Sequence, residues 1–200
     1  MLLAIDSATA ACSAALFERG RLVAERHEVV GRGHAERLVP MIAELIGTRR
    51  PTEILVDCGP GSFTGVRVGL AAAHGLAIGW GVPLAGYSSL AAVAAQAEGE
   101  EVTVALQGGH GELFVQSFAG DPLRPLDEMR SLRPEDAALA AAGRLVIGSG
   151  AEALVAARGH GEWRGALPRA ADAAGLPEAL RSLAPVPIYG RAPDAKPMGA

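Results

Sequence analysis

The sequence predicts an α/β fold in which strands and helices alternate along the chain. Short segments rich in apolar and β-branched residues are separated by glycine- and proline-containing turns, which is typical of strands. Longer segments carry apolar residues at helical spacing. Half of the 200 residues are hydrophobic and 20% are charged, so the chain can bury a substantial core. No apolar run approaches the roughly 20 residues that a membrane-spanning helix needs.

Three strands are expected first. They cover Met1–Ile5, Ala11–Phe17 and Leu22–Val30. A polar turn begins at Asp6, and a second turn places Gly20 where the backbone needs a positive φ. The first half of the chain therefore opens with three consecutive strands, the last two joined as a hairpin.

The first helix is expected from His34 to Gly47, where the spacing of apolar residues becomes helical. Its apolar stripe consists of Leu38, Met41, Ile42, Leu45 and Ile46. Pro40 conflicts with a regular helix, so it either lies in the first turn or introduces a kink.

The next elements give the order β-β-β-α-β-α-β-α. Thr52–Cys58 is predicted as a fourth strand, and a glycine-rich loop over Gly59–Gly65 leads into a helix over Val66–Trp80. Pro83–Tyr87 is the fifth strand, and Ser88 is a suitable N-cap for a helix that ends near Ala97.

The acidic pair Glu100-Glu101 marks a boundary, which divides the chain into domains 1–97 and 98–200. The smaller second domain is expected to hold strands at Val102–Leu106, Leu113–Phe118 and Leu145–Ile147, helices from Pro134 and over Ala151–Ala157 and Glu178–Leu183, and a loop over Asp121–Pro134. Prolines without periodicity predict an extended tail from Pro185 to Ala200.

Composition excludes several classes of function. The net charge of −4 lacks the basic footprint of proteins that hold nucleic acid alone, so no stand-alone nucleic-acid binding is expected. Two cysteines exclude a disulfide framework and a cysteine-based zinc site. The first apolar stretch is too short for a signal peptide, so we expect a soluble, cytoplasmic protein without membrane association.

The loop Gly59–Gly65 lies between a strand and a helix, where backbone N–H groups can hold anions. A Walker loop needs a lysine, and none precedes Lys196. A dinucleotide fingerprint needs a later acidic residue, and none lies between Ser62 and Ala97. The register around Ser62 does not fit a nucleophile elbow. A tight turn that brings the strand close to a buried helix is the simpler interpretation.

Several segments together resemble the bacterial TsaB (YeaZ) family. They occur in the family's order, most specifically over Gly59–Gly69 and most completely over residues 1–97. The segments are Leu3–Thr9, Cys12–Leu16, His34–Ile42, Gly59–Gly69, Ala73–Ala77, Pro83–Leu90 and Pro187–Pro193. The family belongs to the machinery that places threonylcarbamoyl on the adenosine beside the tRNA anticodon.

The resemblance implies an actin/Hsp70-like fold (ASKHA, ribonuclease H-like) with two subdomains, the second reduced. It implies partners as well: the catalytic subunit TsaD, the ATPase TsaE, and a homodimer when the chain is alone. It implies no intrinsic cofactor, with ATP or ADP at the interface with the partner complex.

The resemblance also implies a non-catalytic scaffold without a metal site. Relatives of the TsaD type carry a metal-binding His-x-x-x-His after the fifth strand, whereas Tyr87–Ala91 contains no histidine. Two alternatives stay open: a phosphotransferase that uses Asp6 and the glycine loop, and a metallopeptidase-like enzyme. Asp6 at the end of the first strand fits the first alternative, although a carboxylate that caps its own turn explains it equally well.

Two sets of candidate site residues follow. The loops near a nucleotide would contribute Asp6, Gly59, Gly61, Ser62 and Thr64. The partner interface would consist of His34, Leu38, Met41, Ile42, Leu45, Gly65, Gly69, Ala72, Ala73 and Leu76 on two helices. The alternative is that both helices pack on their own sheet. If they form the interface, Gly69→Leu or Ala73→Trp should abolish partner binding and leave the fold intact.

Overall fold

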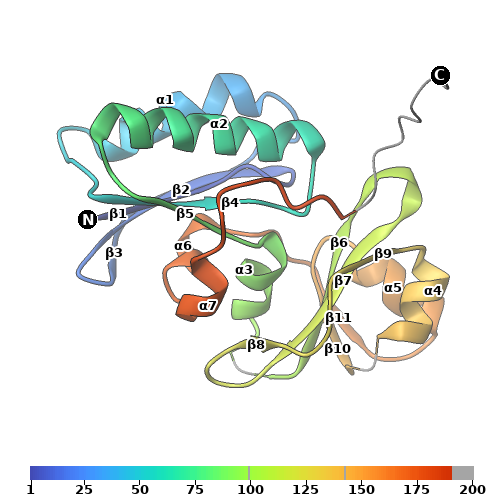
Figure 1. Cartoon of the computed structure of the whole chain (residues 1–200). Coiled ribbons are helices and arrows are strands. Elements are labelled where there is room, and N and C mark those ends of the chain that lie inside the picture. The colour runs from blue at the N-terminus through green and yellow to red at the C-terminus, as the bar shows by residue number, and fades with distance from the viewer. Residues whose placement is uncertain (99, 142, 191–200) are drawn as a thin grey trace, which may run out of the picture.

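The computed structural model describes residues 1–98, 100–141 and 143–190, and its chain forms two sheets (Figure 1). The first sheet has the strand order β3-β2-β1-β4-β5. Its strands are β1 Leu2–Asp6, β2 Ala11–Glu18, β3 Arg21–Val29, β4 Glu53–Asp57 and β5 Leu84–Tyr87. The first three strands pair antiparallel and β1, β4 and β5 pair in parallel, as the predicted order of elements requires.

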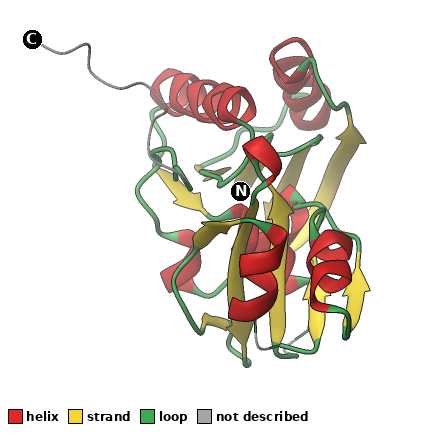
Figure 2. Ribbon diagram, turned by 90° about the vertical axis from the view of Figure 1, so that its right-hand side faces the viewer, coloured by secondary structure: helices red, strands yellow, loops and turns green. Residues whose placement is uncertain are grey.

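Two long helices, α1 (His34–Ile46) and α2 (Phe63–Trp80), cover one face of the first sheet (Figure 1). The view in Figure 2 shows them together at the top of the molecule. The apolar stripe of α1 packs with β1 and β2 residues such as Leu3 and Leu16 in one core cluster. The helix continues through Pro40, which therefore lies inside it and not in its first turn.

The second sheet has the order β11-β10-β6-β7-β8, and β9 also pairs with β7. Its strands are β6 Val102–Gln107, β7 Leu113–Ala119, β8 Arg124–Pro125, β9 Arg130–Leu132, β10 Leu145–Ile147 and β11 Glu162–Arg164. The helices of this half are α3 Ser89–Ala95, α4 Pro134–Ala140 and α5 Ala151–Arg158, with a 3-10 turn at Gly109–Gly111. The predicted loop from Asp121 to Pro134 is thus wrong in part, because β8 and β9 lie within it.

The chain then returns to the first sheet through residues 165–190, which we call the C-terminal strap. Its short helices α6 (Ala170–Ala173) and α7 (Glu178–Arg181) lie on the face of the first sheet opposite α1 and α2 (Figure 1). One apolar core cluster joins this face, α3, α6 and the second sheet. This apolar cluster contains residues from both sides of position 97. The predicted division into domains 1–97 and 98–200 therefore stays a prediction.

The last part of the strap has no regular structure, but it is bonded to the first sheet. Leu183 and Gly86 exchange two backbone hydrogen bonds, and the Ile188 N–H donates to the Cys58 carbonyl at 2.7 Å. Residues 185–190 are irregular as predicted, but they bend at 185, 186 and 190 and are not simply extended; the remainder of the predicted tail at 191–200 lies outside the described residues. Within the described parts of the chain, every helix is too short or too polar to span a bilayer.

Candidate functional site

The glycine-rich loop packs directly against the turn between β1 and β2. A Cβ atom on Gly61 would lie 2.0 Å from the Ala8 carbonyl oxygen, and one on Gly65 would lie 2.1 Å from the Ser7 carbonyl oxygen. The Ser62 N–H donates to the Ala8 carbonyl at 2.6 Å, and the Ser7 hydroxyl donates to the Gly65 carbonyl at 2.9 Å. The glycines therefore serve a close backbone approach, as the simpler interpretation of the sequence predicts.

The same loop begins α2. The Ser62 hydroxyl accepts a hydrogen bond from the Gly65 N–H at 3.2 Å, which is a regular N-cap. Ser62 and Thr64 are exposed, whereas Gly59 is buried next to Asp57. The predicted loop residues are thus brought together around the start of one helix, but only part of them faces solvent.

A pair of buried carboxyl groups lies behind this loop. Strands β1 and β4 are parallel neighbours with Ile5 opposite Val56, so Asp6 and Asp57 follow side by side at their carboxyl ends. Both residues are almost fully buried. Asp57 accepts hydrogen bonds from the Gly59 N–H at 2.7 Å and from the Ser89 hydroxyl at 2.8 and 2.7 Å.

Burial shifts the pKa of both carboxyl groups upward. Desolvation, followed by the neighbouring charge of Asp57, raises the pKa of Asp6 well above its ordinary value. Desolvation raises the pKa of Asp57 to about 7, although the hydrogen bonds from Gly59 and Ser89 oppose the shift. The sequence analysis did not single out Asp57. The feature that could have identified it is its position as an acidic residue at the end of a strand, next to the parallel strand that ends in Asp6.

A cleft of about 330 Å³ opens between the two halves of the chain on the exposed side of the loop. Its walls are backbone and small or neutral side chains: Ala8, Thr9, Ala10, Gly31, Gly61, Ser62, Gln107, Gly108, Gly109, Ser149 and Leu167. Gly61 and Ser62 of the predicted set lie in its wall, whereas Asp6 is buried behind the wall. The cleft therefore offers backbone and hydroxyl hydrogen bonds to a ligand. The carboxyl groups of Asp6 and Asp57 are not among the groups that line it.

The start of α2 also carries an exposed aromatic cluster. The Arg67 guanidinium lies 3.4 Å from the centre of the Phe63 ring and donates to the Tyr189 hydroxyl at 3.0 Å. The two rings are 6.0 Å apart, and both residues are more than half exposed. This cluster joins the end of the strap to α2, and the sequence analysis missed it because Phe63 and Tyr189 are far apart in the chain.

The predicted partner interface requires a correction. Eight of its residues are buried in the chain itself: His34, Leu38, Met41, Ile42, Leu45, Gly65, Gly69 and Ala73. Ala72 and Leu76 are half-buried. The eight buried residues are covered within the chain itself and offer no contact surface, whereas Ala72 and Leu76 keep part of their surface exposed. A wide apolar stripe indicates what a helix buries but not whether its own sheet or a partner covers it.

The opposite faces of the same helices are open. Val39 on α1 is 53% exposed, and Ile78 on α2 is 82% exposed. Trp80 at the end of α2 is 38% exposed. Apolar side chains therefore occur on the outer surface of both helices, where a partner could reach them.

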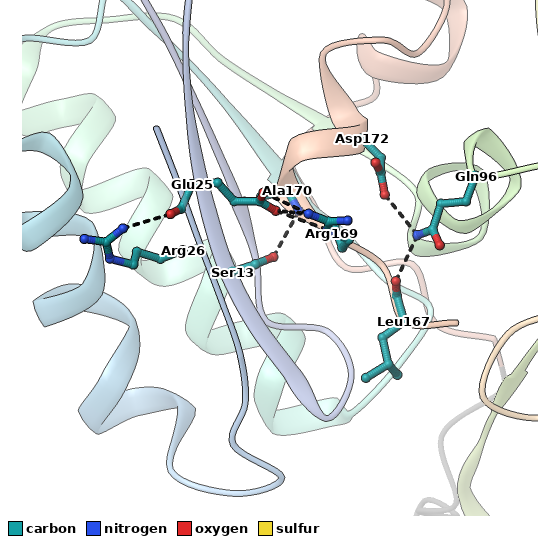
Figure 3. A network of polar contacts seen from close by, with 8 residues as sticks. All are labelled: Ser13, Glu25, Arg26, Gln96, Leu167, Arg169, Ala170 and Asp172. Atoms are coloured by element: carbon teal, nitrogen blue, oxygen red, sulfur yellow. Dashed lines mark hydrogen bonds and ion pairs between the residues drawn. The ribbon is translucent and has the colours of Figure 1, made fainter. Parts of the chain in front are cut away.

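A network of polar contacts holds the strap to both halves of the chain (Figure 3). The Arg169 guanidinium binds the Glu25 carboxylate at 2.8–3.2 Å, and the buried Ser13 hydroxyl accepts from the Ala170 N–H at 2.9 Å. The Gln96 side chain donates to the Leu167 carbonyl and to Asp172. Because Leu167 lies in the wall of the cleft, the strap fixes part of that wall.

Comparison with protein families identifies one matching model. It is described as TsaD: tRNA N6-adenosine threonylcarbamoyltransferase, and it matches residues 26–148. Two curated relatives are each named tRNA threonylcarbamoyladenosine biosynthesis protein TsaB, from Haemophilus influenzae and Escherichia coli. Both are 36% identical to this chain, over 62% and 60% of its length. The matches cover 56% and 55% of the relatives, so the chain spans about half of their length.

Solved structures extend the likeness to nearly the whole chain. One is described as an uncharacterized protein with similarity to peptidase YEAZ from Pseudomonas aeruginosa; it has a TM-score of 0.79 and 30% identity, covering 95% of this chain and 99% of the other. Another, YeaZ from Pseudomonas aeruginosa, has a TM-score of 0.80 and 28% identity, covering 94% and 98%. Together with the two sheets, these matches confirm the predicted actin/Hsp70-like (ASKHA, ribonuclease H-like) α/β fold.

Proposed function

Because this chain belongs to the TsaB (YeaZ) family, we propose that it acts in tRNA threonylcarbamoyladenosine biosynthesis as a non-catalytic subunit that binds a TsaD protein. The observation that carries the proposal is the likeness to YeaZ over almost the full length of both chains. The role in tRNA modification comes from the names of the curated relatives.

The site supports a scaffold better than an enzyme. Its two acidic groups, Asp6 and Asp57, are buried behind the glycine loop, where a substrate in the cleft would not touch them. Tyr87–Ala91, which matches the place where TsaD-type relatives carry a histidine pair, contains no histidine. We therefore assign the chemistry to the partner and place ATP or ADP, if any, at the interface with the partner complex.

The outer faces of α1 and α2 are the surface that we assign to TsaD. Val39, Ile78 and Trp80 supply apolar contact area there, and the buried stripes behind them hold the helices on the sheet. A homodimer of the free chain would use the same surface, and TsaE would join the assembled complex.

A matched pair of variants tests this assignment by co-purification and affinity measurement with a TsaD protein. Ile78→Glu places a charge on the proposed surface, and Leu139→Glu places one on α4, where Leu139 is 90% exposed. We expect the first to weaken TsaD binding about tenfold or more and the second to leave it unchanged. Neither should change the melting temperature, because both side chains are exposed.

Two results would contradict the proposal. Equal TsaD affinity of both variants would place the interface elsewhere, and no detectable binding of the wild-type chain would remove the scaffold function. ATP turnover by the pure chain that is lost in Asp6→Asn would favour the phosphotransferase instead.

A further inference from the structure

In the part of the chain that the structure describes, the buried Asp6 carboxyl group has a hydrogen-bond donor for only one of its two oxygen atoms. Its Oδ1 atom accepts a hydrogen bond from the Ala8 N–H at 3.0 Å. Its Oδ2 atom is fully buried and accepts no hydrogen bond from the described residues. The neighbouring group at the end of the parallel strand is the Asp57 carboxyl, which is itself an acceptor for Gly59 and Ser89 and whose charge raises the pKa of Asp6. Two buried acceptors that face each other are stable only with a proton between them.

We propose that Asp6 and Asp57 share one proton, and that this proton locks the loops at the back of the cleft. In this arrangement Asp6 is protonated at Oδ2 and donates to the Asp57 carboxylate. The inference does not depend on the proposed function, because it concerns groups that no partner or substrate needs to touch.

The shared proton would join three segments of the backbone. Asp6 holds the turn after β1 through Ala8, and Asp57 holds the glycine loop through Gly59. Asp57 also holds the first residue of α3 through the Ser89 hydroxyl. Ala8 and Gly61, which follow closely in the first two segments, lie in the wall of the cleft. The geometry of that wall thus rests on two carboxyl groups that face each other.

Loss of the proton would place two negative charges side by side in a buried site. The other titratable groups that face the pair are Tyr87 on β5, Cys58 after β4, Cys12 on β2 and Asp172 on α6. Each of these groups is an acid, so none can neutralise a second charge. We therefore expect the two loops to separate and the cleft to open as the pH rises.

The direction of the pH dependence follows from proton linkage. The folded pair keeps its shared proton at pH values where both carboxyl groups of the unfolded chain are ionised, which is above about pH 4. The contribution of the pair to stability is therefore greatest in acid and falls as the pH rises, by up to about tenfold in the folding constant per pH unit for this one proton. This contribution is lost once the pH has risen through the raised pKa of the folded pair.

The decisive variant is Asp6→Asn. Its amide oxygen can still accept from the Ala8 N–H, and its NH₂ group is a permanent donor to Asp57. Urea unfolding at a series of pH values above about pH 4 should show a folding constant that falls less steeply with pH in Asp6→Asn than in the wild-type chain. The matched control is Asp136→Asn, which removes an exposed carboxyl in the first turn of α4 and should keep the wild-type slope.

Two wild-type measurements test the lock directly. In the first, an NMR titration of the side-chain carboxyl carbons should show that the pair retains one proton through neutral pH. In the second, hydrogen exchange of the Ala8 and Gly59 amides should accelerate once this proton is lost, by more than the ordinary increase of amide exchange with pH. The proposal is overturned if both carboxyl groups ionise below about pH 5, or if Asp6→Asn keeps the wild-type slope. Should that variant not fold, the resonance titration alone decides.

Discussion

A single methyl group at Gly65 is enough to test how tightly the glycine loop is packed. Gly65→Ala would place a carbon atom 2.1 Å from the Ser7 carbonyl oxygen, and the Ser7 hydroxyl bond to Gly65 would be disturbed. We expect a loss of about 2–4 kcal/mol in the free energy of unfolding, since backbone must move and a buried hydrogen bond weakens. Urea denaturation measures the change.

The control for this variant lies on the same helix. Gly75 is exposed and a Cβ atom there meets no atom within 4 Å, so Gly75→Ala should be neutral or stabilise the chain by up to about 1 kcal/mol. A Gly65→Ala variant as stable as Gly75→Ala would show that the loop is not closely packed. By the same argument Gly69→Leu and Ala73→Trp, which the sequence predicts to act on partner binding, should now unfold the chain.

At the residue scale, the sequence predicts the glycine loop because glycine spacing is visible in one short segment. It does not predict the carboxyl pair, because Asp57 stands beside Asp6 only through the parallel pairing of β1 with β4. The Phe63–Arg67–Tyr189 cluster has the same cause, since its members meet only after the strap has returned to α2. Contacts between distant segments leave no local pattern to read.

At the scale of elements, the ion pair between Glu25 and Arg169 tests how the strap is held. The pair is bidentate and partly shielded, with exposed side-chain fractions of 19% and 47%. A double-mutant cycle with Glu25→Ala and Arg169→Ala should give a coupling of about 0.5–1 kcal/mol.

The second sheet supplies the comparison pair. Arg144 and Glu162 are 82% and 63% exposed, so their coupling should be close to zero. Hydrogen exchange should also separate the two cycles, because loss of the Arg169 contact releases the strap. Equal couplings, with no change in exchange over residues 165–190, would mean that the ion pair does not hold the strap.

The accuracy of the sequence prediction differs between elements for a physical reason. The helix from His34 and the strands of the first half have clear periodicity over many residues, so the sequence predicts them. The missed elements β8, β9, β11 and α6 have only two to four residues each, and neighbouring segments fix them. The apolar stripe of α1 is predicted correctly, but its assignment to a partner is wrong because its own sheet covers it.

At the scale of the whole molecule, the net charge predicts how the free chain behaves toward tRNA. A charge of −4 releases few counterions from a polyanion, so binding to tRNA without a partner should be weak. Fluorescence anisotropy at about 0.15 M salt should show no saturation below roughly 100 µM chain. Saturation near 1 µM that persists as the salt concentration increases would contradict this expectation.

The path of the strap also determines the order in which the molecule can fold. The bond from Ala170 to Ser13 joins positions 157 residues apart, and the Arg169–Glu25 pair joins positions 144 apart. Such long loops lose much conformational entropy before any buried contact compensates for it, which slows folding. Without α6, the sheet face that carries Leu2 and Phe17 lacks part of its cover. A chain whose strap has not docked would therefore expose an apolar β-surface, the kind of surface on which partly folded chains aggregate.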